Sequence, residues 1–243
     1  MMTVLDILQG MELEVPKTKD ERYTYQGKRV PRTTEILQDM WHEESLMKWA
    51  NYLGFKRKDY FKELDYFANI GTIVHDSVEF FLNHNEFPTT PPDYNIINCI
   101  NAFRKWYNAI TKHAEIHVIA MEEKLTCPYF GGTFDLLANI GGKICLIDFK
   151  TSKHIGPKYY MQLSAYKYML SLNGINIDIA MILQLNRDTG DFTEYVVDIT
   201  NNKQHEVFMN ECFECFLSLV YAYFNRQIVT NKFNTMTFNG DEE

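Results

Sequence analysis

A glycine pair between two strand-like segments constrains the fold of this chain more than any other feature. The dipeptide Gly141-Gly142 separates residues 133–140 from residues 143–150, and both segments are short and largely apolar. A two-residue hairpin turn needs positive φ angles, which glycine adopts without a steric penalty. The sequence therefore predicts two antiparallel strands joined by a tight turn that fixes their register.

The register of this hairpin brings two acidic residues opposite each other. If Ile140 pairs with Lys143, counting back along both strands sets Asp135 opposite Asp148. Because side chains alternate along a strand, Asp135, Asp148 and Lys150 then share one face. The other face is predicted to be the core face and carries Phe134, Leu136, Ala138, Ile140, Cys145, Ile147 and Phe149.

Two opposed carboxylates need a counter-charge. Directly opposed residues have Cβ atoms roughly 4.5–5.5 Å apart, where like charges repel. Carboxylate oxygens suit Mg²⁺ or Mn²⁺, and Lys150 would stand beside such an ion, where it could polarise a water. The alternative interpretation is an exposed hairpin face with ordinary charges, stabilised by an ion pair of Lys150.

The composition fits one large globular domain and limits the kind of partner. The chain has 243 residues, 46% of them hydrophobic, and a formal net charge of -8. A negative chain is not expected to coat nucleic acid non-specifically, but a nucleic-acid enzyme needs only local basic contacts. Two basic clusters could provide them, Lys28-Arg29 with Arg32 and Lys56-Arg57-Lys58 with Lys62.

The cysteines and the apolar segments indicate the compartment. The five cysteines are scattered over predicted core elements, so we expect reduced, buried thiols rather than disulfides. Cys212 and Cys215 have metal-type spacing, but they lie in an apolar helical pattern without a second pair. No apolar run reaches the roughly 18 residues of a membrane span, and residues 1–10 lack a signal-peptide pattern. We therefore expect a soluble, cytoplasmic protein with no membrane partner.

Hydrophobic periodicity and turn residues predict the remaining elements. Helices are expected from Glu35 after a cap at Thr33 or Thr34, over 43–53 with a stop at Gly54, over 60–82 with a break at Gly71, and over 95–112, 159–172 and 203–227. Strands are expected over 115–127, 177–185 and 192–198, with a small hairpin around Gln26-Gly27. This order predicts a buried mixed sheet flanked by helices.

Five motifs occur in a fixed order around the central hairpin. They are Gly-Thr-Ile-Val-His75, Glu122, Gly132-Thr133-Phe134-Asp135, Ile147-Asp148-Phe149-Lys150-Thr151-Ser152 and Gln162-Leu163-Ser164-Ala165-Tyr166. An isolated D-x-K is not specific, but the five together resemble the PD-(D/E)XK nuclease superfamily, in its RecB-like branch and its phage-type and mitochondrial genome maintenance exonucleases. An upstream match over residues 31–54, which includes Trp49, also resembles that exonuclease subgroup.

The resemblance implies an α/β (α+β) fold with a restriction-endonuclease-like core, a central mixed β-sheet flanked by helices, and an N-terminal helical extension. Within a single structural unit we expect four segments. They are an N-terminal arm and small hairpin (1–30), a helical region that packs on the core and contributes His75 (31–112), the PD-(D/E)XK nuclease core (113–200), and a C-terminal helix with a polar tail (201–243).

The resemblance also implies DNA phosphodiester hydrolysis with one or two Mg²⁺ or Mn²⁺ ions. By analogy, Asp135, Asp148 and the backbone carbonyl of Phe149 are metal ligands, and His75 is the additional ligand of the RecB-like branch. Lys150 orients or activates the attacking water.

Further residues are assigned to the same site by resemblance. Glu122 matches the family's glutamate and is preferred to Glu123, which alternation points to the opposite face. Gln162 and Tyr166, one helical turn apart, are expected to contact or position DNA near the scissile phosphate. The remaining expected nucleic-acid contacts are Thr151, Ser152, Lys153, Arg32, Lys56, Arg57 and Lys58.

The expected activity is that of an exonuclease on single-stranded or end-frayed DNA, in phage-type replication, recombination or repair. Replication or recombination proteins are the expected partners. If a phage encodes the protein, the host cytoplasm is its expected location. The first alternative is a structure-specific or CRISPR-adaptation-like endonuclease. The iron-sulfur type of that class needs four cysteines, and only Cys212 and Cys215 follow the Gln/Tyr helix, so no iron-sulfur cluster is expected. The second alternative is a non-catalytic DNA-binding subunit, which would have no use for paired carboxylates facing phosphates.

Overall fold

The computed structural model describes residue 8 and residues 23–236. Of the expected N-terminal arm, residues 1–21 lie outside the described residues apart from Leu8, which is buried. Arg22 and the end of the polar tail, residues 237–243, also lie outside them. The predicted small hairpin is present as β1 (Thr24–Tyr25) and β2 (Lys28–Arg29).

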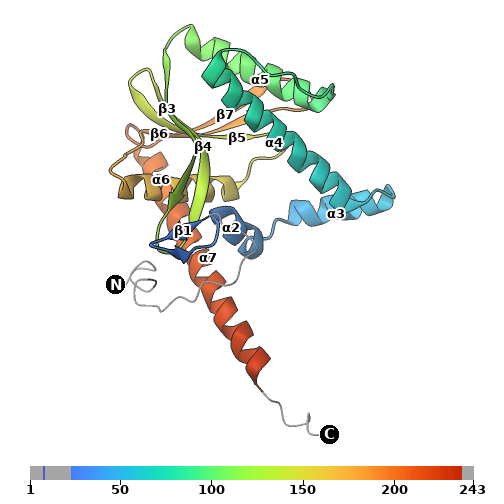
Figure 1. Ribbon diagram of the computed structural model, residues 1–243, viewed down its shortest axis with the longest axis vertical. Coiled ribbons are helices and arrows are strands. Elements are labelled where there is room, and N and C mark those ends of the chain that lie inside the picture. The colour runs from blue at the N-terminus through green and yellow to red at the C-terminus, as the bar shows by residue number, and fades with distance from the viewer. Residues whose placement is uncertain (1–7, 9–22, 237–243) are drawn as a thin grey trace.

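The centre of the molecule is one five-stranded mixed sheet, with strands in the order β3-β4-β5-β6-β7 (Figure 1). The strands are β3 (Ile116–Thr126), β4 (Gly131–Ile140), β5 (Lys143–Lys150), β6 (Ile179–Leu185) and β7 (Phe192–Asp198). Neighbouring strands are antiparallel except β5 and β6, which are parallel and joined through the crossover helix α6 (Pro157–Leu172). The predicted mixed sheet flanked by helices is confirmed.

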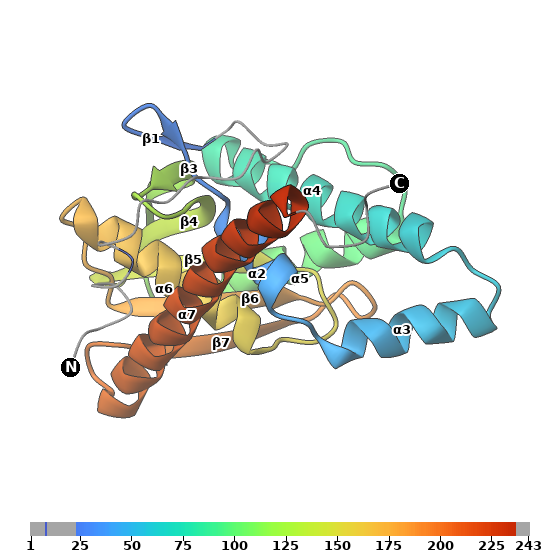
Figure 2. The same cartoon turned by 90° about the horizontal axis from the view of Figure 1, so that it is seen from below.

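Helices cover both faces of this sheet (Figures 1 and 2). On one face, α4 (Tyr60–His84) and α5 (Tyr94–Thr111) pack over a cluster that includes Leu136 and Ile147. On the other, α2 (Thr33–Met40), α6 and α7 (Lys203–Thr235) pack over a cluster that includes Leu137 and Leu146. The prediction of a single core face on the hairpin was therefore wrong, because the face that carries Asp148 is also buried.

The hairpin register is as predicted up to the site. Gly141 and Gly142 have φ angles of 58° and 84°, and the pairs run from Ile140↔Lys143 to Leu136↔Ile147. The next predicted pair, Asp135 with Asp148, is not part of the ladder. Instead, the Asp135 carboxylate accepts a 2.6 Å hydrogen bond from the backbone N–H of Phe149.

Side-chain alternation also fails at this point. Phe134 packs in the cluster under α6 and α7, whereas Leu136 packs in the cluster under α4 and α5. Two residues of the same parity therefore lie on opposite faces, and the strand is irregular around Asp135. The two strands of the hairpin separate here, which opens the sheet at the end away from the turn.

One predicted helix break does not occur. The helix α3 (Glu44–Phe55) ends one residue beyond the stop predicted at Gly54, whereas α4 runs through Gly71 as a single helix of 25 residues. A glycine costs a helix only about 1 kcal/mol relative to alanine. In α4, burial of Ile70, Val74 and Val78 on either side of Gly71 outweighs that cost.

The helix α7 is longer than predicted and ends at Thr235. By length and composition alone it could cross a membrane. That is weak evidence, because the core helix of a soluble protein passes the same test, and α7 buries Phe216, Val220 and Phe224 within the molecule. All five cysteines are free thiols, and four of them are buried, as predicted.

Asn98 connects α5 to the turn between β6 and β7. Its amide nitrogen donates to the carbonyl oxygens of Arg187 (2.8 Å) and Asp188 (3.0 Å), and its side chain is buried. We expect Asn98→Ala to lower the free energy of unfolding by about 1–3 kcal/mol, because two carbonyls lose their donor. Urea denaturation measures this change. Asn108→Ala, at an exposed position of the same helix, should cost less than about 0.5 kcal/mol, and equal losses in the two variants would contradict the assignment.

Candidate functional site

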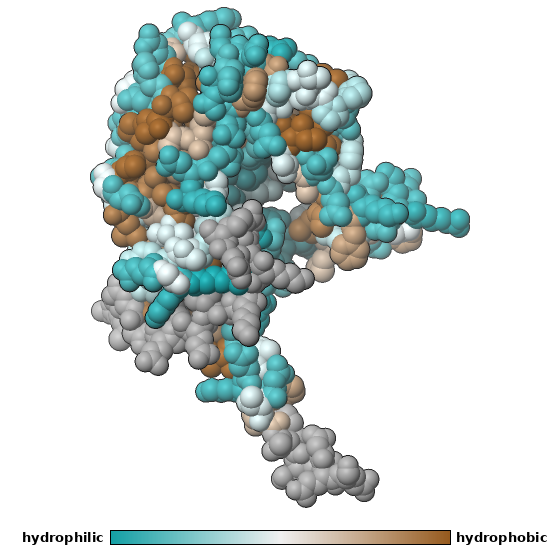
Figure 3. Space-filling model, in the orientation of Figure 1, coloured by the Kyte–Doolittle hydropathy of each residue, from teal (hydrophilic) through white to brown (hydrophobic). Residues whose placement is uncertain are grey.

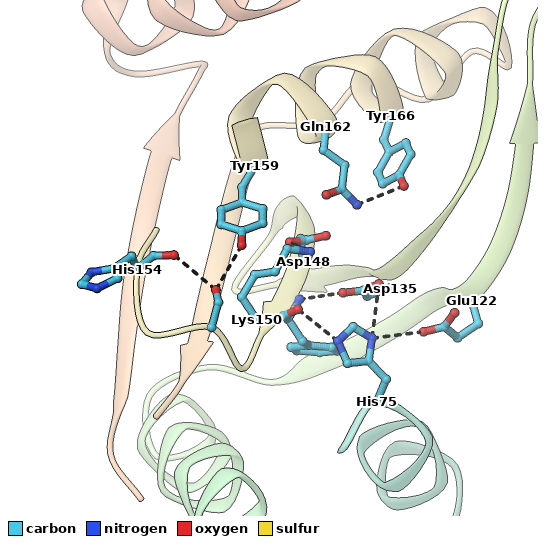
Figure 4. Close-up of polar contacts among 11 residues, drawn as sticks. His75, Glu122, Asp135, Asp148, Lys150, His154, Tyr159, Gln162 and Tyr166 are labelled. Atoms are coloured by element: carbon cyan, nitrogen blue, oxygen red, sulfur yellow. Dashed lines mark hydrogen bonds and ion pairs between the residues drawn. The ribbon is translucent and has the colours of Figure 1, made fainter. Parts of the chain in front are cut away.

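The candidate site lies where β4 and β5 separate, between α4 and α6 (Figure 4). Beyond Ile147, β5 pairs with β6 alone, through Asp148↔Ile182 and Lys150↔Gln184. His75 approaches from α4, while Gln162 and Tyr166 approach from α6. The site is therefore assembled from elements on both faces of the sheet.

His75, Glu122 and Asp135 form a cluster whose ligand atoms lie within 4.8 Å of one another. Nδ1 of His75 is 3.5 Å from Asp135 Oδ1 and 3.8 Å from Glu122 Oε1. Its Nε2 is 3.0 Å from the backbone carbonyl oxygen of Phe149. The structure thus brings together four of the groups that the sequence assigned to a metal site.

The carboxylates of this cluster favour a positive charge beside them. Burial alone would lower the pKa of His75, but the carboxylates of Asp135 and Glu122 outweigh it and raise the pKa to about 10. Burial likewise would raise the pKa of Asp135, but the charge of His75 overcomes it and keeps that pKa low. With protein groups alone, a protonated His75 supplies the positive charge that the carboxylates require.

Asp148 lies outside that cluster and pairs with Lys150. Its side chain is only 1% exposed, and Nζ of Lys150 is 2.5 Å from its Oδ2. The Lys150 ammonium group satisfies Oδ2, whereas Oδ1 has no hydrogen-bond donor among the described residues. Burial raises the pKa of Asp148, the nearby charge of Asp135 raises it further, and Lys150 opposes both. Asp148 is thus a buried acid with unused acceptor capacity.

Glu122 has an unusual backbone conformation for a strand residue. Its φ is +47°, in the left-handed region, and the β3–β4 register has a bulge nearby, between Val118 and Ala120. Such a conformation costs on the order of 1–3 kcal/mol in a residue other than glycine and is frequent at functional sites. Here it accompanies a carboxylate aimed at His75, so Glu122, and not Glu123, is the glutamate of the cluster.

On the α6 side, Gln162 and Tyr166 are buried and face the site, as predicted. Nε2 of Gln162 donates to the Tyr166 hydroxyl at 3.1 Å. The Tyr166 ring lies against the backbone of Gly132, where an added Cβ would be 2.5 Å from its Cε1 atom. The glycine of the Gly-Thr-Phe-Asp motif therefore leaves room for Tyr166.

Sequence reasoning missed two residues that support the site. Tyr159 lies 5.1 Å from Nζ of Lys150, measured to the ring centroid, and its hydroxyl donates to Ser152 Oγ. The buried Gln184 donates to the carbonyl oxygens of Ser152 and Lys153 and so holds the loop after β5. Both had a signal, since Tyr159 is three residues before Gln162 on one helix, and Gln184 is a polar residue in an apolar strand.

The predicted nucleic-acid contacts fall into separate places. Thr151, Ser152 and Lys153 follow β5 directly, and Lys153 pairs with Asp188 at 2.6 Å. Arg32 forms a parallel bridge with Gly131 at the start of β4. The remaining three, Lys56, Arg57 and Lys58, lie at the corner between α3 and α4 and not beside the cluster.

A cavity of about 490 Å³ lies next to the cluster. It is lined by Ala68, Gly71, Thr72, His75, Asp76, Glu79 and Glu122. These residues come from one side of α4 and from β3, and three of them are acidic. The cavity gives access from solvent to the His75 end of the site.

Comparison with solved structures finds exonucleases as neighbours. A phage-related exonuclease from Haemophilus somnus 129PT shares 12% identity with a TM-score of 0.36, over 83% of this chain and 96% of that chain. The alkaline exonuclease LHK-Exo from Laribacter hongkongensis shares 12% identity with a TM-score of 0.32, over 54% and 69%. LHK-Exo in complex with dAMP shares 11% identity with a TM-score of 0.31, over 65% and 83%.

No protein-family model and no curated protein matches the chain. TM-scores as low as these do not establish a shared fold or activity for this chain.

The contact between Gly132 and Tyr166 is directly testable. We expect Gly132→Ala to lower the free energy of unfolding by about 1–3 kcal/mol, because the new methyl group displaces the buried ring. Gly71→Ala is the matched control. A Cβ added at Gly71 would lie 3.7 Å from Thr151 Oγ1, an ordinary contact. Because alanine favours the helix interior over glycine, Gly71→Ala should raise the free energy of unfolding by up to about 1 kcal/mol. Chemical denaturation that finds Gly132→Ala as stable as the wild type would contradict the packing role.

Proposed function

We propose that this chain is a metal-dependent deoxyribonuclease that hydrolyses phosphodiester bonds. The observation that carries the proposal is Asp148, a buried carboxylate that pairs with Lys150 through one oxygen and has no donor among the described residues for the other. A purely structural ion pair is stabilising only when its remaining lone pairs are satisfied. Unused acceptor capacity next to a second group of acidic ligands is what a metal-assisted hydrolase needs.

The donor set fits a hard divalent cation. Carboxylate oxygens, one backbone carbonyl and one imidazole are ligands that Mg²⁺ or Mn²⁺ accepts. The groups that would hold one or two such ions are His75, Glu122, Asp135, Asp148 and the carbonyl of Phe149. A bound ion would lower the pKa of a water and stabilise the charge that develops on the phosphate.

The protein's own groups have distinct roles in this proposal. Lys150 keeps its proton, because the carboxylates of Asp148 and Asp135 outweigh the effect of its burial on the lysine pKa. Its ammonium group therefore orients the attacking water and adds positive charge beside the phosphate. The amide of Gln162 and the hydroxyl of Tyr166 are donors on the opposite side, positioned to hold phosphate oxygens.

We further propose an exonuclease that acts on single-stranded or end-frayed DNA, in phage-type replication, recombination or repair. The support for this mode is the subgroup resemblance of the motifs around His75 and Trp49. In this proposal Thr151, Ser152 and Lys153, in the loop after β5, contact the strand.

The proposed hydrolysis is tested with end-labelled DNA. We expect wild-type protein with Mg²⁺ or Mn²⁺ to degrade linear single strands, and EDTA to abolish the reaction. Asp148→Ala and Lys150→Ala should each reduce the rate by at least about a hundredfold, because each removes a group that acts on the water or the metal. Asp191→Asn, an exposed aspartate paired with Lys105, is the control and should keep the wild-type rate.

The substrate form separates the alternatives. An exonuclease leaves circular single-stranded DNA intact, so equal cleavage of circular and linear strands would indicate an endonuclease. DNA binding without hydrolysis in either metal would instead indicate a non-catalytic binding subunit.

Metal binding has a readout that does not depend on activity. A ligand that binds the native state raises its stability by RT ln(1 + [L]/Kd), or about 1.4 kcal/mol at a tenfold excess over Kd. We expect Mn²⁺ to raise the melting temperature of the wild type and of Asp191→Asn. Asp135→Asn should lose most of this increase, because Asp135 belongs to the cluster with His75. An undiminished increase in Asp135→Asn would exclude Asp135 as a ligand.

A further inference from the structure

A helical arm, formed by α3 and the first part of α4 (residues 44–66), stands away from the sheet (Figures 1 and 3). In α3 the one fully buried side chain is Leu53. The two helices are held together by aromatic contacts, in which the Trp49 ring lies 5.4 Å from Tyr60 and 6.1 Å from Phe67. Most of the tip of the arm, residues 52–62, is open to solvent, although Leu53 is buried and Tyr60 is half-buried.

The tip exposes aromatic rings that the fold does not need. Phe55 and Phe61 are 82% and 72% exposed, the highest values among the exposed large hydrophobic residues of the described chain. Tyr52 beside them is also exposed. Large apolar side chains that gather on a surface mark an interaction site, because burying them against a partner removes apolar area from water.

The charge at the tip selects the kind of partner. Between Phe55 and Lys62 the chain carries four cations, Lys56, Arg57, Lys58 and Lys62, and one carboxylate, Asp59. That carboxylate is occupied as the N-cap of α4, where it accepts from the backbone N–H groups of Phe61 and Lys62.

Part of this positive charge is available to a partner. Lys58 pairs with Glu63 at 2.8 Å, whereas Arg57 and Lys62 form no ion pair within the described residues. In a chain of net charge -8, a local excess of cations indicates a polyanionic partner.

We infer that the tip of the arm binds single-stranded DNA, with Phe55 and Phe61 stacking on unpaired bases and the cations contacting phosphates. Aromatic rings interleaved with basic side chains are the usual platform for single strands, since every base offers a π-face. In a duplex those faces are stacked inside the helix, so the rings would have no base to contact. This inference rests on the proposed function and deepens it, because it names a single strand as the substrate that the arm holds.

The helix α4 connects the tip directly to the candidate site. From Phe61 to His75 the helix rises about 21 Å, at about 1.5 Å per residue. A strand stacked as in a duplex, at about 3.4 Å per nucleotide, covers that length in about six nucleotides, and a more extended strand covers it in fewer. A strand that lies along α4 can therefore occupy the tip and the site at the same time.

The test is a binding measurement without divalent metal, so that hydrolysis does not interfere. Fluorescence anisotropy compares a labelled twenty-nucleotide oligo(dT) with a blunt duplex of equal length, in EDTA. We expect Phe55→Ala/Phe61→Ala to bind the single strand about tenfold more weakly, as the loss of base stacking predicts. Its duplex affinity should change less than about twofold, since paired bases are not available to stack. Tyr94→Ala, an exposed aromatic at the start of α5, is the matched control and should bind as the wild type does.

A second variant tests the cations. Arg57→Ala/Lys62→Ala should weaken single-strand binding and flatten its dependence on salt, because fewer counterions are released. If both variants bind DNA as tightly as the wild type does, the inference is wrong and the proposed nuclease remains in place. If Phe55→Ala/Phe61→Ala lowers the affinity for the single strand and for the duplex equally, base stacking is excluded. A wild-type protein that binds no DNA would overturn the inference and the proposed function together.

Discussion

The carboxylate of Asp135 sets the geometry of the whole candidate site. One of its oxygens accepts from the backbone N–H of Phe149, at the point where the β4–β5 ladder ends. The other lies 3.5 Å from His75 of α4. A side chain thus replaces a strand-to-strand hydrogen bond, and the two strands can separate without leaving the Phe149 N–H unpaired. That separation gives α4 and α6, from opposite faces, a common place to meet.

The site concentrates features that oppose stability. Asp148 is buried with one carboxylate oxygen that no described residue donates to, and Glu122 holds a left-handed backbone inside a strand. Each feature costs on the order of 1–3 kcal/mol. The two hydrophobic clusters on either face of the sheet supply the stability that offsets these costs. Such a site therefore requires a sheet that helices cover on both faces.

The sequence predicted the hairpin, its turn and its register as far as Leu136 and Ile147, because a glycine pair is a local signal. It predicted His75, Gln162 and Tyr166 at the site through their motif positions, and the structure brings them there. It did not predict the end of the ladder at Asp135, because a side-chain hydrogen bond across 14 residues has no periodic signature. It was wrong about the break at Gly71, because tertiary packing outweighs the low helix propensity of a single glycine.

The unbroken course of α4 limits how the length of the arm can vary. Each residue added to an α-helix turns everything beyond it by about 100°. An insertion of one or two residues between Lys62 and His75 would leave the tip attached but swing it around the molecule, or else turn His75 away from Asp135. Only changes near whole turns, such as seven residues in two turns, keep both ends facing as they do now. The reach of the arm can therefore change only in steps of about whole helical turns if both of its ends are to keep their present directions.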